Sequence, residues 1–240
     1  MSFVLSQEQE LLIQKAHEGK NILVDACIGS GKTTSIQHLC QRLPASKNIL
    51  YLTYNRLLKV EAKSKIKGKN ITVTNYHGFA YNALKNASIS CGISDLIQTF
   101  IREKPAFPFY DVLVIDEYQD IDQELSELLD IIKSSNPRMQ IIAVGDMEQK
   151  IYDKTTLDLR EFIGQFLGEY ECLAFTRCFR LNADHAAMLG RVWGKEITGV
   201  NDGCQISKMS IAQVIPFLAN QSPEELLCLG ARKGGMSNKR

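Results

Sequence analysis

A glycine-rich run lies at the point where an expected strand turns into an expected helix, and few folds accommodate such a run there. An apolar segment at 22–24 precedes the run, and apolar residues at helical spacing follow it between Ile36 and Leu43. The run itself comprises Ala26, Cys27, Ile28, Gly29, Ser30, Gly31, Lys32, Thr33 and Thr34. A strand, a loop of this composition and a helix, in that order, are typical of a phosphate-binding P-loop.

Each residue type in the run suits the binding of a nucleoside triphosphate. Gly29 and Gly31 allow the backbone to curl until successive N–H groups point inward, and the N-terminus of the following helix adds partial positive charge. Lys32 is then expected to reach the β- and γ-phosphates. Thr33 is expected to offer its hydroxyl to Mg²⁺, a hard cation that prefers oxygen ligands. We therefore expect residues 26–34 to bind ATP together with Mg²⁺.

An acidic run predicts the other half of a nucleotide site. Residues 116–120 follow the unbroken apolar segment 112–115, which is typical of a strand buried on both faces of a parallel sheet. Ligands of such folds bind at the carboxyl edge of the sheet. Asp116 is therefore expected to hold Mg²⁺, directly or through water, and Glu117 to orient and deprotonate the attacking water. Alone, an acidic run can be a solvated helix start, but with the P-loop it predicts ATP hydrolysis.

Composition and charge narrow the class of protein. Hydrophobic residues make up 45% of the 240 residues and the net charge is only +1, so any binding of nucleic acid must depend on local basic residues. Seven cysteines without a Cys-x-x-Cys pair argue against a zinc site or a disulfide framework. Glu8 and Glu10 argue against a signal peptide, and no stretch approaches the ~20 apolar residues of a membrane span. We expect a soluble, intracellular protein of the cytoplasm, nucleoid or host nucleus, without a membrane partner.

Strand and helix patterns alternate along most of the chain. Ser6 and Gln9 form a predicted capping box for a first helix. Strands are expected at 21–25, 48–53, 70–74, 111–115, 139–144 and about 170–175. This alternation predicts an α/β fold with a doubly wound parallel sheet. We expect a first domain at 1–167, an incomplete second one at 168–230 that ends with a strand at 226–229, and a mobile tail at 231–240.

Five further segments occur in a fixed order around these two motifs. They are Leu5–Gln9, Tyr51–Arg56, Asn75–Phe79, Val144–Tyr152 and Phe175–Arg180. Over roughly residues 3–182, the chain thereby resembles superfamily 1 DNA helicases of the UvrD, PcrA and F-box helicase type. The resemblance implies a RecA-like P-loop NTPase lobe with the start of a second RecA-like lobe. It also implies an ATP-driven, 3′-to-5′ motor that acts on single-stranded DNA.

The resemblance also assigns roles to individual residues. Gln9 is implied to grip the adenine base through both amide groups, Gln149 to lie near the γ-phosphate and Arg180 to reach it. Gln119 and Asp120 are implied to connect the ATP site to neighbouring elements. The residues implied to contact single-stranded DNA are Tyr54, Asn55, Arg56, Tyr76 and His77.

The residues by themselves leave these DNA contacts open. Tyr54 and Tyr76 offer flat faces for stacking, although aromatic residues at strand ends are more often part of a core. His77 alone is more typical of a structural histidine, and Arg180 alone of a surface charge. The basic run from Arg56 to Lys69, opposed only by Glu61, predicts either a phosphate-binding patch or a solvated helix face.

Two departures from the family pattern bear on activity. Asp153, Lys154 and Thr155 stand where relatives carry an aromatic residue that stacks on a DNA base. No segment after Arg180 resembles the remaining second-lobe motifs, one of which provides another catalytic arginine. We therefore expect ATP and Mg²⁺ binding, slow hydrolysis and no processive unwinding by these residues alone. A protein that supplies the rest of the second lobe is a candidate partner.

Three functions follow from these observations. The leading one is the motor lobe of a DNA helicase or translocase, in DNA repair, recombination or replication. The alternative is a truncated relative that binds ATP or DNA as a regulatory or interaction module with little turnover. A P-loop kinase for a small metabolite is the third, and it is disfavoured by the acidic run at 116–120 and by the segment around Gln149.

Overall fold

The computed structural model describes residues 4–54, 66, 68–150, 157–204 and 209–219. The chain divides into two compact units, Met1–Cys204 and Gln205–Arg240. The first unit contains the sheet and every candidate site residue that the structure describes. In the second unit, the described residues form one helix, α9 (Ile211–Ala219).

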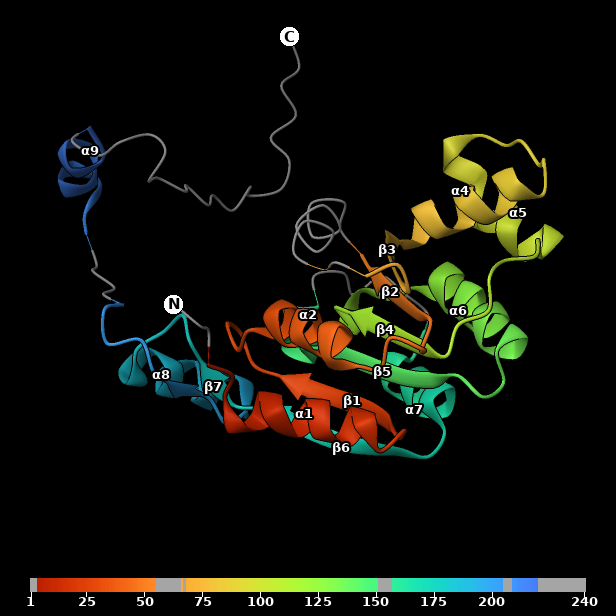
Figure 1. The fold of residues 1–240 in the computed structure, drawn as a ribbon. Helices are drawn as coiled ribbons and strands as arrows, with labels where there is room; N and C mark the ends of the chain where they lie inside the picture. Colours follow the sequence, from red (N-terminus) through yellow and green to blue (C-terminus); the bar gives the residue numbers. More distant parts are fainter. Residues whose placement is uncertain (1–3, 55–65, 67, 151–156, 205–208, 220–240) are drawn as a thin grey trace, which may run out of the picture. The chain divides into compact units, whose positions relative to one another are not determined.

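The first unit is built on a six-stranded sheet in the order β3-β2-β4-β5-β1-β6 (Figure 1). Every neighbouring pair of strands runs parallel. The strands are β1 (Asn21–Ala26), β2 (Ile49–Thr53), β3 (Ile71–Asn75), β4 (Val112–Asp116), β5 (Gln140–Gly145) and β6 (Tyr170–Phe175). Each begins and ends within one residue of its predicted position, which confirms the predicted doubly wound parallel sheet.

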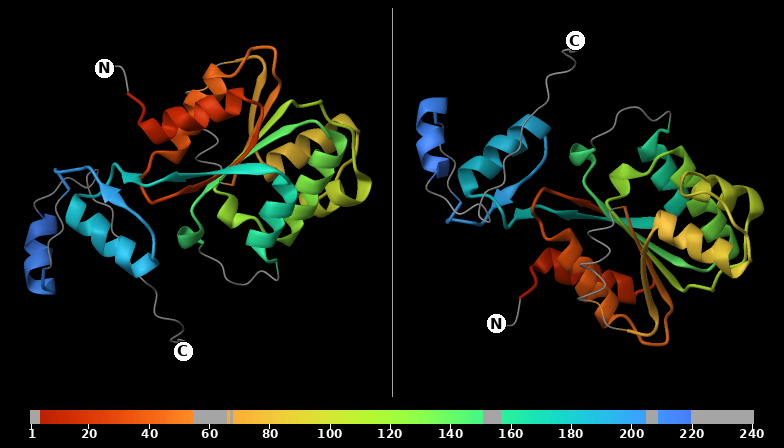
Figure 2. Two further views of the ribbon diagram at one scale, coloured as in Figure 1. Left: turned by 90° about the horizontal axis from the view of Figure 1, so that it is seen from below. Right: turned by 90° about the horizontal axis from the view of Figure 1, so that it is seen from above.

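Helices cover both faces of this sheet (Figure 2). One face carries α1 (Gln7–His17) and α2 (Lys32–Arg42). The other face carries α4 (Tyr76–Asn86), α5 (Leu96–Glu103), α6 (Gln123–Ser135) and α7 (Leu159–Leu167). Short 3₁₀ helices occur at η1 (Ile93–Asp95), η2 (Tyr118–Asp120) and η3 (Met147–Gln149). No helix in the described ranges has the length and apolar character needed to cross a membrane.

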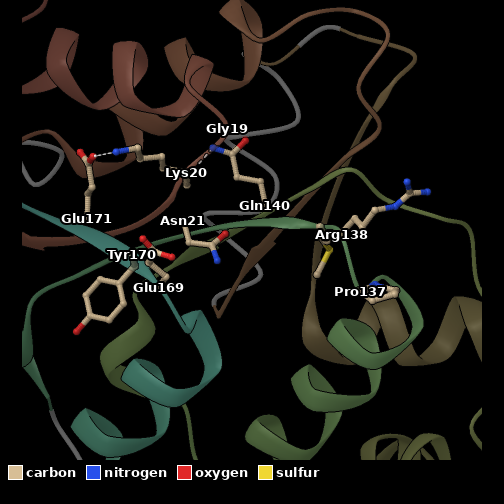
Figure 3. A pocket seen from close by; sticks show the side chains of 10 residues that line it. Gly19, Lys20, Asn21, Pro137, Arg138, Gln140, Glu169, Tyr170 and Glu171 are labelled. Atoms are coloured by element: carbon tan, nitrogen blue, oxygen red, sulfur yellow. Dashed lines mark hydrogen bonds and ion pairs between the residues drawn. The ribbon is translucent and has the colours of Figure 1, made fainter.

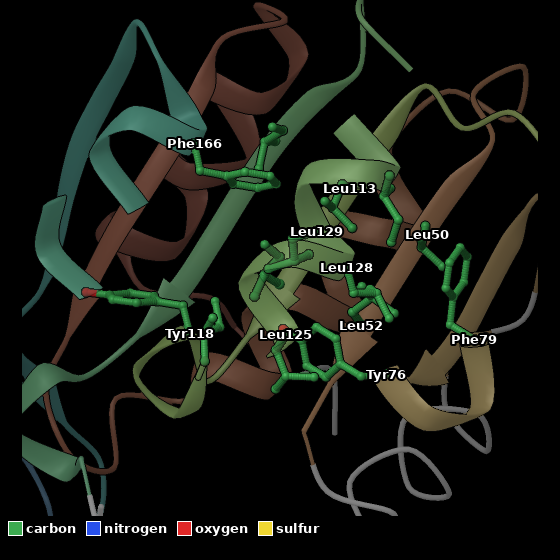
Figure 4. Close-up of a cluster of buried hydrophobic side chains, with 14 of the residues drawn as sticks. Leu50, Leu52, Tyr76, Phe79, Leu113, Tyr118, Leu125, Leu128, Leu129 and Phe166 are labelled. Carbon is green, nitrogen blue, oxygen red and sulfur yellow. The ribbon is translucent and has the colours of Figure 1, made fainter. Parts of the chain in front are cut away.

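The strands divide their side chains between two cores. Leu50 and Leu52 of β2 face α4–α7, whereas Ile49 and Tyr51 of the same strand face α1 and α2. This alternation follows from the two-residue period of a strand, and it explains why β2 and β4 are apolar at nearly every position. Figure 4 shows the larger core, in which leucines of β2, β4 and α6 interdigitate. Burying one such side chain stabilises the fold by about 1.5–3 kcal/mol.

The segment after β6 begins a separate small sheet within the first unit. β7 (Arg177–Cys178) pairs in parallel with β8 (Thr198–Gly199), and α8 (Ala183–Trp193) connects them. The expected second domain at 168–230 includes β6, but β6 pairs with β1 in the first sheet along its whole length. Residues 170–175 therefore belong to the first sheet, because they continue its parallel hydrogen-bond ladder. The remaining division into domains stays a prediction, and residues 226–229 and the tail lie outside the described residues.

Candidate nucleotide-binding and hydrolysis site

A cavity of about 320 Å³ lies at the carboxyl edge of the sheet and gathers most of the predicted site residues. It is lined by Gly29, Ser30, Gly31, Lys32, Thr33, Thr34, Glu117, Gln149 and Arg180. These residues come from four segments of the chain that are far apart in sequence. The parallel strands bring them together because β1, β4 and β5 all end at this edge.

The predicted phosphate loop has the backbone that its glycines were expected to allow. Gly29 has φ +67° and Gly31 has φ +78°, a region that other residues seldom adopt. A β-carbon at Gly29 would also lie 2.7 Å from Cβ of Arg180, and one at Gly31 would lie 2.9 Å from Nε2 of Gln9. Gly31 is the N-cap of α2, so the positive end of this helix borders the cavity. The loop is thereby suited to an anion of the size of a triphosphate.

Asp116 has the environment expected of a cation ligand. Its side chain is fully buried, and its Oδ2 accepts a hydrogen bond of 2.7 Å from the hydroxyl of Tyr51. Its Oδ1 is buried without a hydrogen-bond partner among the described residues. Burial, and then the nearby charge of Glu117, raise the pKa of Asp116 to about 7. A buried carboxylate oxygen without a partner is costly, so this atom, with the hydroxyl of Thr33 in the cavity lining, fits Mg²⁺ either directly or through water.

Glu117 lies in the cavity wall in a strained backbone conformation. Its φ of 56° is in the left-handed region, which costs about 1–3 kcal/mol for a residue with a side chain. Its Oε2 accepts a hydrogen bond of 2.8 Å from Nε2 of Gln119 and lies 3.6 Å from Nζ of Lys32. The charge of Glu117 also acts on the neighbouring Asp120 carboxyl. Burial first, and then this charge, raise the pKa of Asp120 to about 6. The predicted base therefore has a fixed orientation beside the predicted phosphate-binding lysine.

Gln119 joins the acidic run to the loop after β5. Its Oε1 accepts a hydrogen bond of 3.0 Å from the backbone N–H of Asp146, while its Nε2 binds Glu117. Asp146 is fully buried, and its Oδ2 accepts a hydrogen bond of 2.7 Å from Nε2 of Gln149. Gln149, which was expected near the γ-phosphate, is thus connected through two hydrogen-bonded residues to Glu117.

Gln9 does not have the free amide that the adenine contact requires. It is only 1% exposed, and its Oε1 accepts from the backbone N–H of Ser6 in the predicted capping box. Its Nε2 donates to the carbonyl of Ser30 at 3.2 Å. The oxygen and one N–H of the amide are therefore engaged within the protein, and the rest of the amide is buried with the side chain. In this structure Gln9 supports the phosphate loop instead of offering its amide to a base.

Phe179 is a residue beside the loop to which sequence reasoning assigned no role. Its backbone N–H donates to the carbonyl of Gly29 at 2.9 Å. Its ring lies 3.9 Å from the position that a β-carbon of Gly31 would take, and the residue is 38% exposed. The guanidinium of Arg177 lies 5.8 Å from the ring centroid. An aromatic residue within the segment 175–180 was the available signal, but its approach to the phosphate loop depends on the tertiary fold.

The predicted DNA contacts divide into exposed and buried residues. Tyr54 and His77 are exposed, and they follow the ends of β2 and β3, which pair in register at Thr53 and Asn75. Tyr76 is only 2% exposed and packs in the core between α4 and α6, as Figure 4 shows. Its ring therefore has no free face for a base, which corrects the prediction. Asn55, Arg56, most of the basic run and residues 153–155 lie outside the described residues.

A second cavity, of about 440 Å³, lies at the opposite edge of the sheet, at the amino ends of β1, β5 and β6 (Figure 3). Lys20 in its wall pairs with Glu171, and Gln140 donates to backbone carbonyls of Ala16 and Lys20. None of the predicted site residues lines it. The smaller cavity at the carboxyl edge is therefore the one that matches the motifs.

Comparison with known protein families supports the assignment of this site. The family model described as an AAA domain matches residues 9–155, which is more than half of the chain. The chain belongs to this AAA domain family. Its matched region contains the phosphate loop, the acidic run and Gln149, so all of these lie in the AAA domain. Arg180 and the β7–α8–β8 segment lie beyond the match.

The sequence of a DNA helicase and the structures of several helicases are similar to this AAA domain. The ATP-dependent DNA helicase UvrD1 of Mycobacterium leprae (strain TN) is 24% identical over 178 residues, which cover 65% of this chain and 21% of the relative. The chain thus spans about a fifth of that relative's length. A structure of Bacteroides Pif1 bound to ssDNA has a TM-score of 0.50 and 16% identity, covering 82% of this chain and 48% of that one. Another, of two coordinating Pif1 helicases at forked dsDNA, has a TM-score of 0.50, 16% identity and coverages of 82% and 50%.

These similarities confirm the resemblance drawn from the motifs. The fold is a RecA-like α/β fold, and the AAA domain resembles the corresponding lobe of superfamily 1 helicases. At these low sequence identities, the structural similarity to the solved helicases shows a shared fold.

Proposed function

We propose that this AAA domain binds ATP and Mg²⁺ in the cavity at the carboxyl edge of its sheet and hydrolyses ATP as the motor lobe of a DNA helicase or translocase. The observation that carries this proposal is the gathering of Lys32, Glu117, Gln149 and Arg180 around one cavity. The partnerless Oδ1 of Asp116 supports a divalent cation there.

The geometry supports a division of tasks between these residues. The backbone N–H groups of residues 29–32 bind the phosphates, and Lys32 binds their outer oxygens. Thr33 and Asp116 would hold Mg²⁺, which neutralises charge on the phosphate oxygens. Glu117 accepts a proton from the attacking water, and Arg180 stabilises the charge that develops on the transferred phosphoryl group.

The ion pair between Lys32 and Glu117 supports an ordered activation. At 3.6 Å the two side chains partly neutralise each other. A triphosphate attracts Lys32 more strongly than one carboxylate does, so binding draws the ammonium group away from Glu117. Glu117 then keeps its hydrogen bond from Gln119 and is left to accept a proton. Hydrolysis is thereby coupled to the arrival of ATP.

Single-stranded DNA is the proposed partner, bound without sequence preference across Tyr54 and His77. The names of the relatives, which are DNA helicases or are bound to ssDNA, support this choice. A role in repair, recombination or replication, 3′-to-5′ movement, an intracellular location and a protein that completes the second lobe stay predictions. Phe179 is an additional candidate to stack on the nucleobase, because its exposed ring lies beside the phosphate loop.

A single substitution tests the proposed enzyme. Glu117→Gln keeps the size of the side chain and one oxygen that can accept from Gln119, but it removes the base. We expect ATP binding at least as tight as in the wild type, because Lys32 has no ion pair to leave. DNA-stimulated phosphate release should fall about 10²–10⁴-fold, the usual contribution of a general base. Glu169→Gln, an exposed change in the cavity at the opposite edge, is the matched control and should keep full turnover.

The outcomes also separate the other functions. Tight ATP binding by the wild-type chain without turnover at any DNA concentration would favour a regulatory or interaction module. Transfer of the phosphoryl group to a nucleoside or a sugar, with none to water, would favour a kinase. Phosphate release that Glu117→Gln leaves unchanged would refute the assignment of the base.

A further inference from the structure

Lys195 donates hydrogen bonds to three oxygen atoms of residues that lie next to the candidate site. It lies between α8 and β8, and its side chain is only 14% exposed. Its Nζ donates to Oδ1 of Asp25 at 2.6 Å, to the carbonyl of Ala26 at 3.0 Å and to Oδ1 of Asp146 at 3.0 Å. The three donor hydrogens of an ammonium group are thereby all used.

The three acceptors belong to the elements that form the cavity. Ala26 is the last residue of β1 and directly precedes the rest of the phosphate loop. Asp146 follows β5, is fully buried and accepts a hydrogen bond from Gln149 with its other oxygen. One carboxylate therefore separates Lys195 from Gln149 in the cavity wall. Lys195 contacts β1 and the loop after β5 at the same time.

A second branch of the same network reaches the predicted base. The backbone N–H of Asp146 donates to Gln119, and Gln119 donates to Glu117. Asp146 is thus the point where Lys195, Gln149 and the acidic run meet.

The electrostatics make this arrangement dependent on the lysine. Although burial lowers the pKa of Lys195, the hydrogen bonds from its ammonium group to Asp25 and Asp146 outweigh burial and raise the pKa, so the side chain is charged. Asp146 is buried, and among the described residues Lys195 is the cation that pairs with it. Oδ1 of Asp146 also accepts from the backbone N–H of Glu148 at 3.2 Å. Without the cation, this buried carboxylate keeps neutral donors but lacks a compensating charge, which favours a turn toward water. Such a turn would displace the hydrogen bond from Gln149.

We propose that Lys195 is a positioning residue that couples the β7–α8–β8 segment to the cavity through Asp146 and Gln149. The proposal rests on the proposed ATP site, and it adds a means of regulation to it. A displacement of this segment that withdraws Lys195 frees the Asp146 carboxylate, and Gln149 then loses its hydrogen bond to it. Because Gln149 is expected near the γ-phosphate, which ADP lacks, the preference for ATP over ADP then depends on the position of the segment. A chain of hydrogen bonds with a charged residue at one end is a suitable carrier of such coupling.

The test compares the affinities for two nucleotides in the full chain. Lys195→Met removes the charge but keeps most of the side-chain length, and Lys47→Met, on an exposed lysine, is the matched control. Calorimetry with Mg²⁺ measures the dissociation constants of ADP and of a non-hydrolysable ATP analogue. We expect Lys195→Met to weaken binding of the analogue about tenfold, within the usual range of coupling between sites, and to leave that of ADP nearly unchanged. Lys195→Arg, which keeps the charge, should restore part of the loss.

A double-substitution cycle tests the route through Gln149. If Lys195 acts through Asp146 and Gln149, Lys195→Met should weaken the analogue no further once Gln149→Ala is present. Additive losses would overturn this route. An equal loss for ADP and for the analogue would overturn the inference too, because it would indicate a general loss of structure.

Failure of the inference is distinguishable from failure of the proposed function. No magnesium-dependent nucleotide binding by the folded wild-type chain would refute both. Normal binding by the wild type, with the same ratio of analogue to ADP affinity in Lys195→Met, would refute only the coupling. If circular dichroism shows that Lys195→Met is unfolded, Lys195→Gln replaces it, and an unchanged ratio in that variant equally overturns the coupling.

Discussion

Replacing Asp116 with Asn should remove catalysis and at the same time stabilise the metal-free protein at alkaline pH. The carboxyl group is fully buried and its Oδ1 lacks a partner among the described residues. Its pKa is raised from 3.8 to about 7, with burial as the main cause. Folding therefore favours the protonated carboxyl, and the stability that it contributes is complete below pH 4 and is lost as the pH rises through about 7.

The size of this effect follows from the difference between the two pKa values. At about 1.36 kcal/mol per pH unit, ionisation of Asp116 costs the folded state about 4 kcal/mol at pH 8, of which about 3 kcal/mol develops between pH 5 and pH 8. Asparagine does not titrate, and its oxygen still accepts from the hydroxyl of Tyr51. Its amide nitrogen takes the place of the partnerless Oδ1, and a buried amide left without an acceptor costs about 1–3 kcal/mol at every pH. The diagnostic quantity is therefore the difference in free energy of unfolding between the variant and the wild type, followed as a function of pH.

Urea unfolding of the wild type and of Asp116→Asn, followed by circular dichroism without Mg²⁺ between pH 5 and pH 8, measures this quantity. The variant should gain about 3 kcal/mol relative to the wild type across this range. Asp202→Asn, on an exposed aspartate, should follow the wild type. Mg²⁺ with an ATP analogue at 100 times its dissociation constant should stabilise the wild type by about 2.7 kcal/mol and the Asn variant far less. Parallel pH profiles for the wild type and Asp116→Asn would refute the buried, titrating carboxyl.

Three further predictions concern packing and DNA. Gly145→Ala should destabilise the fold by about 1–3 kcal/mol in urea unfolding, because the added carbon would lie 2.5 Å from Oε1 of Gln119; Gly164→Ala, with its nearest neighbour at 3.9 Å, should not. Tyr54→Ala should weaken binding of a fluorescent single-stranded oligonucleotide by about 1–3 kcal/mol. Tyr76→Leu, which removes the buried ring, should leave the affinity of the folded protein unchanged, and a loss there without one in Tyr54→Ala would contradict the observed burial. The same assay across salt concentrations should give a slope of about 0.7 for each phosphate neutralised, and salt-independent binding would remove the proposed DNA contact.

Local sequence patterns were enough to predict the sheet and the position of the phosphate loop. Strand patterns predicted all six strands within one residue, because apolar runs bounded by turn residues are local signals. The positive φ values of Gly29 and Gly31 likewise follow from a local requirement of the loop. Because parallel strands end at one edge of the sheet, the proximity of Lys32 and Glu117 could also be inferred from the sequence.

The partners of the polar side chains, by contrast, depend on how distant segments pack together. Gln9 has the residue type for an adenine contact, but the N-terminus of α1 and the carbonyl of Ser30 engage its amide. Tyr76 has the residue type for base stacking, but the packing of α4 against α6 buries it. Lys195 carries no motif signal, and it meets Asp146 across 49 positions of the chain. Burial and hydrogen-bond partners depend on contacts between distant segments, and the period and composition of a single segment do not encode them.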